Sequence, residues 1–157
     1  MKRILGVFLM CWAFAMPAFG AQYRAALVAD MDTGRILYQE NAGVQNYPAS
    51  LTKIMTLYLT FDALEHGRLQ LDDYLIVSKS AASASPVKLG LAAGSKIKVE
   101  DAIKALTVLS ANDVARVLAE NLKGGMEGNF ADLMTRVAGE IGLSGTNFEN
   151  SSGLPDD

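Results

Sequence analysis

Cysteine, histidine and tryptophan each occur once in the 157 residues. The single cysteine, Cys11, lies in an apolar N-terminal run, so the remainder of the chain has neither a disulfide nor a thiol nucleophile. The single histidine, His66, excludes a histidine-cluster metal site. The net charge is −3 and there is no basic patch, which argues against nucleic acid as a partner. These scarcities leave serine, lysine and carboxylate chemistry, and we expect no metal and no other cofactor.

The N-terminus has the pattern of a secretory signal peptide. Lys2 and Arg3 form a charged start, residues 4–19 are almost entirely apolar, and Ala18 and Gly20 provide a small-x-small cleavage site. We expect cleavage between Gly20 and Ala21, which would leave an exported mature chain of residues 21–157. The alternative is an uncleaved membrane anchor, for which the apolar run is short.

Local patterns predict a chain of mixed α and β structure. A hairpin is expected at the N-terminal end of the mature chain, because two apolar stretches flank the turn-forming Asp32-Thr33-Gly34. The same triplet occurs in aspartic proteases, but their chemistry needs two such carboxylates. The expected strands are 23–30, 35–38, 71–78 and 96–99; the expected helices are 50–65, 99–109, 112–122 and 128–141; residues 80–94 and 143–157 are expected to be loops.

A serine and a lysine stand three positions apart at the start of the first predicted helix. Ser50 and Lys53 would share one helix face and could touch. A buried lysine of lowered pKa can take the proton of a serine nucleophile, and a helix N-terminus favours a developing oxyanion. The alternative is a helix cap beside a solvated lysine. His66 lies at the far end of the same helix, roughly 24 Å from Ser50 at 1.5 Å per residue, so a Ser-His-Asp triad is disfavoured.

The residues that follow Lys53 are apolar nearly all round the helix, which predicts a buried central helix. A second polar pair, Ser110 and Asn112, lies at the junction of two predicted helices. There Ser110 could relay a proton between Lys53 and a leaving amine, and Asn112 could hold Lys53 and bind a substrate amide. The alternative is that Ser110 only caps the next helix. Together the two pairs match two of the three motifs of the penicillin-recognising serine enzymes.

Several stretches resemble one family in that family's order. The mature chain, about Ala21 to Asp157, is similar to the D-alanyl-D-alanine carboxypeptidases, the low-molecular-weight penicillin-binding proteins. The stretches that carry the resemblance are 27–30, 33–38, 48–56, 110–113, 142–143, 147–148 and 152–155. The resemblance implies a β-lactamase/transpeptidase-like α/β (α+β) fold, with an antiparallel sheet flanked by helices and an all-helical cluster. The active site would lie between them.

The resemblance also implies the chemistry. A bacterial periplasmic hydrolase would remove the terminal D-alanine from peptidoglycan stem peptides that end in D-Ala-D-Ala. Ser50 would be the nucleophile, Lys53 the general base, Ser110 the proton relay and Asn112 a substrate-binding residue. β-Lactams would acylate Ser50 and inhibit the enzyme.

The third family motif, Lys-Thr-Gly or Lys-Ser-Gly on an edge strand, does not occur in these 157 residues. We therefore expect an incomplete sheet, a C-terminally truncated catalytic domain and poor solubility of the mature fragment. A tail that associates with the inner membrane would also lie beyond residue 157. The alternatives are an inactive remnant, a cell-wall-binding fragment, or a D,D-endopeptidase of the same family. A class A β-lactamase is disfavoured because no glutamate fits its Glu-x-x-Leu-Asn motif.

Overall fold

The computed structural model describes residues 25–155. The predicted signal peptide of residues 1–20 lies outside the described residues. The chain divides into two compact units, with the boundary after Asn46, and each unit is described by itself. The assignment of residues 21–157 to one part of a catalytic domain stays a prediction.

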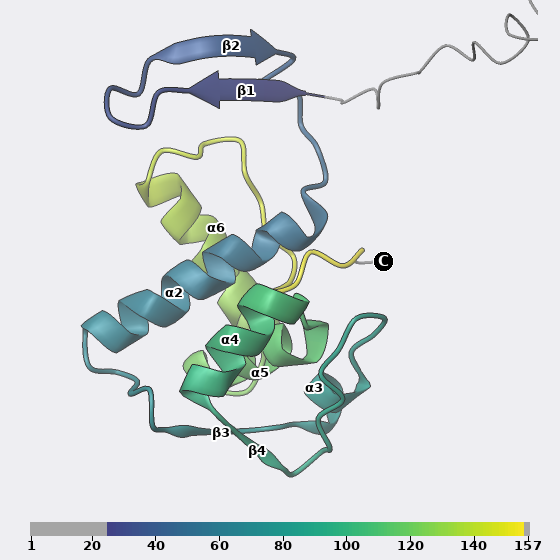
Figure 1. Cartoon of the computed structure of the whole chain (residues 1–157). Helices are drawn as coiled ribbons and strands as arrows, with labels where there is room; N and C mark the ends of the chain where they lie inside the picture. The colour runs from purple at the N-terminus through teal and green to yellow at the C-terminus, as the bar shows by residue number, and fades with distance from the viewer. Residues whose placement is uncertain (1–24, 156–157) are drawn as a thin grey trace, which may run out of the picture. The chain divides into compact units, whose positions relative to one another are not determined.

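The first unit is a β-hairpin (Figure 1). Strand β1 (Ala26–Ala29) pairs antiparallel with β2 (Ile36–Glu40). The Thr33 N–H donates to Asp30 Oδ1 at 2.8 Å, and Gly34 has a φ of +68°, which favours glycine. The predicted hairpin is confirmed, and Asp32-Thr33-Gly34 belongs to its turn.

The second unit is mainly helical, with one small sheet. Strands β3 (Tyr74–Ile76) and β4 (Lys96–Lys98) pair antiparallel, with Leu75 opposite Ile97. The described residues thus contain two separate two-stranded antiparallel sheets. The other elements are the 3₁₀ turn η1 (Ala49–Thr52) and the helices α2 (Lys53–Glu65), α3 (Lys79–Ser83), α4 (Val99–Leu109), α5 (Asn112–Leu122) and α6 (Glu127–Glu140).

Helix α5 is the central helix of this unit. It packs against α2, α3, α4, α6 and β3, and almost all of its residues from 112 to 120 are buried. Small and β-branched side chains such as Val114, Ala115 and Val117 let its neighbours approach closely, and all three are fully buried. Each large apolar side chain buried in this way contributes roughly 1.5–3 kcal/mol.

The expectation of a buried central helix at residues 50–65 is wrong in one respect. Helix α2 buries one face, which includes Met55 and Leu59, but Ile54 and Phe61 on another face are 63% and 51% exposed. A helix that is apolar on all sides can be packed against neighbours on two faces. In the described residues only one face of α2 is packed in this way.

The predicted loop 80–94 contains an unexpected helix at its start. The Ser78 side chain accepts a hydrogen bond from the Ala81 N–H at 2.8 Å and so caps α3. The following Lys-Ser-Ala-Ala-Ser sequence has enough helix propensity for one turn and a half. Its small residues form no amphipathic pattern, so the sequence by itself predicts a loop here.

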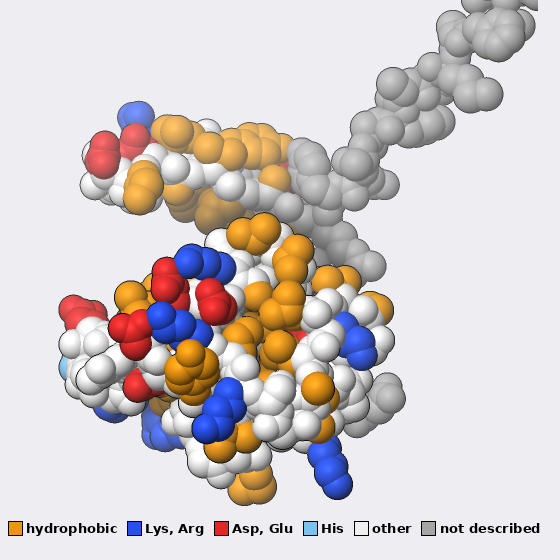
Figure 2. Space-filling model, turned by 60° about the horizontal axis from the view of Figure 1, so that its bottom comes forward, with side chains coloured by type: hydrophobic (Ala, Val, Ile, Leu, Met, Phe, Trp, Pro, Cys, Tyr) orange, Lys and Arg blue, Asp and Glu red, His pale blue; other side chains and the backbone are white. Residues whose placement is uncertain are grey.

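Apolar side chains remain visible on the surfaces of both units (Figure 2). Among the described residues, however, no helix combines the length and the apolar character needed to cross a membrane.

Candidate active site

Ser50 and Lys53 meet at the start of α2. Pro48 precedes the 3₁₀ turn that carries Ser50, and Lys53 is the first residue of the helix proper. The Lys53 Nζ lies 3.2 Å from the Ser50 Oγ. Ser50 is exposed, while Lys53 is only 4% exposed. The predicted i, i+3 contact is therefore present, between an exposed serine and a buried lysine.

Burial governs the ionisation of this lysine. Desolvation lowers the pKa of Lys53 from its ordinary value, because the charged ammonium loses its hydration. A lysine with a lowered pKa is more often neutral, and a neutral amine can accept a proton from the neighbouring hydroxyl. The pair has the arrangement required of a nucleophile and its base.

A segment near the C-terminus completes the surroundings of the lysine. The Lys53 Nζ donates to the Ser152 carbonyl at 2.8 Å, and the Thr56 Oγ1 donates to the Ser151 carbonyl at 2.7 Å. The sequence predicts a loop here, in a stretch that resembles the carboxypeptidase family, but assigns it no role at the site. Its backbone carbonyls carry no residue-type signal, so no motif search for polar side chains could have found them.

Ser110 and Asn112 lie at the junction of α4 and α5, as predicted. Ser110 is the C-cap of α4, with a left-handed φ of 55°, and Asn112 opens α5 and is 4% exposed. Helices α2 and α5 pack together. Within residues 25–155, however, no hydrogen bond joins Ser110 or Asn112 to Ser50 or Lys53. The proton-relay and lysine-holding roles therefore stay predictions.

Asp113, for which the sequence suggests no more than a part in capping the next helix, anchors this junction. Its side chain is fully buried and accepts hydrogen bonds from the backbone N–H groups of Leu89 and Gly90, both at 2.9 Å, and of Leu91 at 3.2 Å. The Asn112 N–H donates to the Val87 carbonyl at 2.8 Å. The start of α5 is therefore tied to the loop before β4, beside the predicted site residues.

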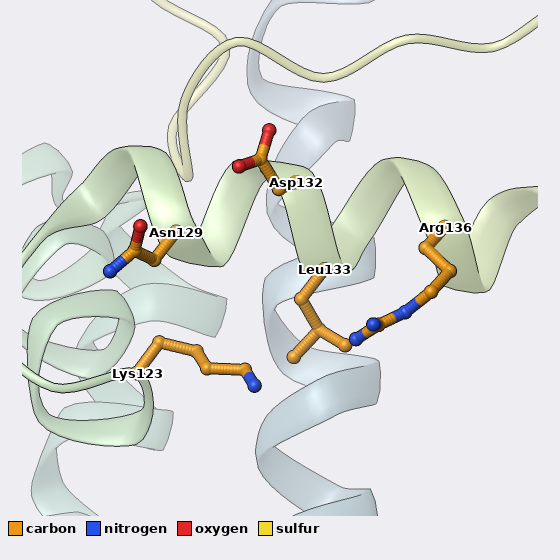
Figure 3. A pocket seen from close by; sticks show the side chains of 5 residues that line it. All are labelled: Lys123, Asn129, Asp132, Leu133 and Arg136. Carbon is orange, nitrogen blue, oxygen red and sulfur yellow. The ribbon is translucent and has the colours of Figure 1, made fainter.

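A surface hollow lies elsewhere on the second unit (Figure 3). It has a volume of about 380 Å³ and is lined by residues of α6 and the end of α5. Lys123 and Arg136 approach it from opposite ends, with Leu133 between them. None of the predicted site residues lines it. Among the described residues, no group of three or more His, Cys, Asp or Glu side chains is placed to hold a metal.

His66 lies at the C-terminal end of α2, away from the candidate site. It is the C-cap residue of α2, and its Nδ1 lies 2.9 Å from the carbonyl oxygen of Asp62, one turn earlier. It is thus at the opposite end of the helix from Ser50, as expected.

Comparison with known proteins identifies the family. The family model of the D-alanyl-D-alanine carboxypeptidases matches residues 14–157. The D-alanyl-D-alanine carboxypeptidase DacF of Bacillus subtilis is 33% identical over 171 residues, which cover 100% of this chain and 44% of DacF. The chain therefore belongs to the D-alanyl-D-alanine carboxypeptidase family.

Solved structures agree with this assignment. The carboxypeptidase DacD from Francisella tularensis superposes with a TM-score of 0.81 and 38% identity over 85% of this chain and 32% of that one. Penicillin-binding protein D2 from Listeria monocytogenes, in its ampicillin-bound form, gives a TM-score of 0.74 and 32% identity over 85% of this chain and 53% of that one. The fold is that of the penicillin-binding proteins, as predicted. The chain spans about a third to a half of the length of these relatives.

Proposed function

We propose that this chain carries the acylation site of a serine-type D-Ala-D-Ala carboxypeptidase that removes the terminal D-alanine from peptidoglycan stem peptides. The observation that carries the proposal is the 3.2 Å contact between Ser50 Oγ and the buried Lys53 Nζ. Membership of the carboxypeptidase family supports the substrate class. The ampicillin-bound relative supports β-lactams as inhibitors.

The proposed reaction proceeds through an acyl-enzyme. Ser50 Oγ attacks the carbonyl carbon between the two D-alanines while Lys53 Nζ takes the hydroxyl proton. The C–N bond then breaks, and the leaving D-alanine amine receives a proton through Ser110. Water, deprotonated by the same base, hydrolyses the ester and frees Ser50. Asn112 is assigned to binding the substrate amide.

The proposal includes an exported, periplasmic location with the signal peptide cleaved near Gly20 and Ala21. The composition of residues 1–20 and the extracellular position of the peptidoglycan substrate support it. Association with the inner membrane through a segment beyond residue 157 is part of the same proposal.

The test is the intact mass of residues 21–157 after incubation with benzylpenicillin, beside the Ser50→Ala variant. We expect one penicilloyl adduct on the parent chain and none on the variant. Circular dichroism of both chains controls for folding. A folded parent chain without an adduct would contradict the proposal that this chain carries a working acylation site.

The pH dependence of the same reaction tests the role of Lys53. Because burial lowers the pKa of Lys53 below its ordinary 10.5, the neutral base becomes available as pH rises toward that lowered value. Acylation should accelerate through this range and level off above it. A rate independent of pH across the alkaline range, measured by quenched time courses, would argue against Lys53 as the base.

A further inference from the structure

The segment 150–153 provides the second hydrogen-bond partner of the buried lysine, besides Ser50. Lys53 Nζ donates to the Ser152 carbonyl at 2.8 Å, and this carbonyl can only accept. A neutral amine has two N–H donors and one lone pair. With one N–H directed to the carbonyl, the lone pair is free to face the Ser50 hydroxyl, so the position of this segment decides whether Lys53 can act as a base.

Two acceptors fix the segment in place. Asn150 Oδ1 accepts from the N–H groups of Ser152 and Gly153, at 3.1 and 2.7 Å. Glu127 Oε1 accepts from the N–H and the Oγ of Ser151, at 3.0 and 2.5 Å. Asn150 belongs to the segment itself. Glu127, the first residue of α6, therefore ties the segment to α6, while the Thr56 Oγ1, which donates to the Ser151 carbonyl, ties it to α2.

Glu127 is itself held rigidly. Its Oε2 accepts from Arg116 Nε on α5 at 2.5 Å, and the two side chains are only 15% and 24% exposed. Charge-assisted hydrogen bonds of this kind are short and about twice as strong as neutral ones. The carboxylate thus connects α5 and α6 to Ser151, the residue before the carbonyl that accepts the hydrogen bond from Lys53.

We propose that Glu127 is a positioning residue for Lys53, acting through Ser151 and the Ser152 carbonyl. Only the description of Lys53 as a general base rests on the proposed function. Without the carboxylate, the Ser151 N–H and hydroxyl lose their acceptor, the segment moves away, and water reaches Lys53.

The direction in which the pKa of Lys53 changes when Glu127 is replaced distinguishes a positioning role of Glu127 from a purely electrostatic effect of its charge. The groups in hydrogen-bonding contact with Lys53 Nζ, Ser50 Oγ and the Ser152 carbonyl, are uncharged. Glu127 and Arg116 are the charged pair behind the segment. Loss of the Glu127 charge, with Arg116 left unpaired, lowers the pKa of Lys53 by Coulomb's law, whereas hydration of the amine raises it.

The experiment follows the titration of Lys53 by NMR of ¹³C-labelled lysine in the full chain. The Lys53 signal is assigned by its loss in Lys53→Met. We expect Glu127→Ala to raise the pKa of Lys53. Glu140→Ala, which removes an exposed carboxylate at the other end of α6, is the matched control and should leave it unchanged. Ser151→Ala, which removes the hydroxyl bond alone, should give a smaller rise and serves if Glu127→Ala does not fold.

Benzylpenicillin acylation provides the second measurement. We expect the first-order acylation constant of Glu127→Ala to fall about tenfold or more, as for other misplaced catalytic groups, and that of Glu127→Gln, which keeps an acceptor oxygen, to fall less. An unchanged or lowered pKa of Lys53 in a folded Glu127→Ala or Ser151→Ala chain would overturn the positioning role. A raised pKa without acylation of any variant, the parent included, would contradict the proposed function and uphold the positioning role.

Discussion

Gly153 is the residue at which the lysine-holding segment meets the start of the serine turn. A Cβ atom added there would lie 1.9 Å from the Ala49 carbonyl oxygen and 2.7 Å from Thr52 Oγ1. The backbone φ of +78° also favours glycine. Ala49 immediately precedes Ser50, so this close approach of two backbones helps to define where the nucleophile sits.

Replacement of Gly153 by alanine should therefore be severely destabilising. We expect Gly153→Ala to lower the free energy of unfolding by about 3 kcal/mol or more, from the left-handed conformation and the overlap together. The measurement is urea denaturation followed by circular dichroism.

Gly94→Ala is the matched control. Gly94 has a similar φ of +81° but nothing within 4 Å of an added Cβ. It should lose only about 1–2 kcal/mol, the cost of the backbone conformation alone. If the two variants lost the same free energy of unfolding, the backbone at Ala49 would be able to shift and make room for the added methyl group at little cost.

At the scale of elements, the junction of α4 and α5 depends on a buried carboxylate. Asp113 accepts from three consecutive loop N–H groups, at residues 89–91. It thereby joins the loop to the helix that carries Asn112. Ser110 ends α4 in a left-handed conformation. For a residue with a Cβ atom this backbone conformation costs about 1–2 kcal/mol, which the contacts of the junction must offset.

Asp113→Ala should loosen this junction. Three backbone donors would lose their acceptor, and we expect the free energy of unfolding to fall by roughly 3 kcal/mol or more. Differential scanning calorimetry gives the change. Asp132→Ala, at an exposed position within α6, should alter stability by no more than about 0.5 kcal/mol. A loss at Asp113 no larger than that of the control would refute its anchoring role.

At the scale of the whole molecule, exposed apolar surface is the main feature. Along α2 and the turn before it, Leu51, Ile54, Tyr58 and Phe61 are 66, 63, 48 and 51% exposed. Contiguous apolar surface of this kind promotes association. The hairpin also exposes apolar side chains, among them Leu27 and Ile36.

Residues 21–157 should consequently self-associate at micromolar concentrations. We expect the double variant Ile54→Lys/Phe61→Lys to shift sedimentation-velocity profiles toward the monomer with little change in melting temperature. Val108→Lys, at a position on α4 that is 79% exposed and outside the α2 surface, should change the profile much less. A parent chain that sediments as a monomer and melts cooperatively would contradict the expectation.

Those features of the molecule that depend on near neighbours in the chain could be predicted from the sequence. Helices α4 and α5 begin and end where their patterns indicate, and the hairpin turn follows from Asp30 and Gly34. The contact of Ser50 with Lys53 was also predictable. Helical geometry brings positions i and i+3 together regardless of what surrounds them.

The surroundings of that pair are a matter of tertiary structure. The carbonyl that receives a hydrogen bond from Lys53 lies 99 residues away in the sequence, and Glu127 acts on it from another helix. Every residue has a backbone carbonyl, so the residue type does not reveal which carbonyl will accept a hydrogen bond. Packing between distant segments likewise produces no periodic pattern in the sequence. For the same reason the sequence predicted that the helix at residues 50–65 would be the buried central helix, whereas in the structure that helix is α5. The acid–base pair is a local property of the chain, whereas the burial that lowers the pKa of Lys53 and the acceptor that orients its amine exist only in the folded unit.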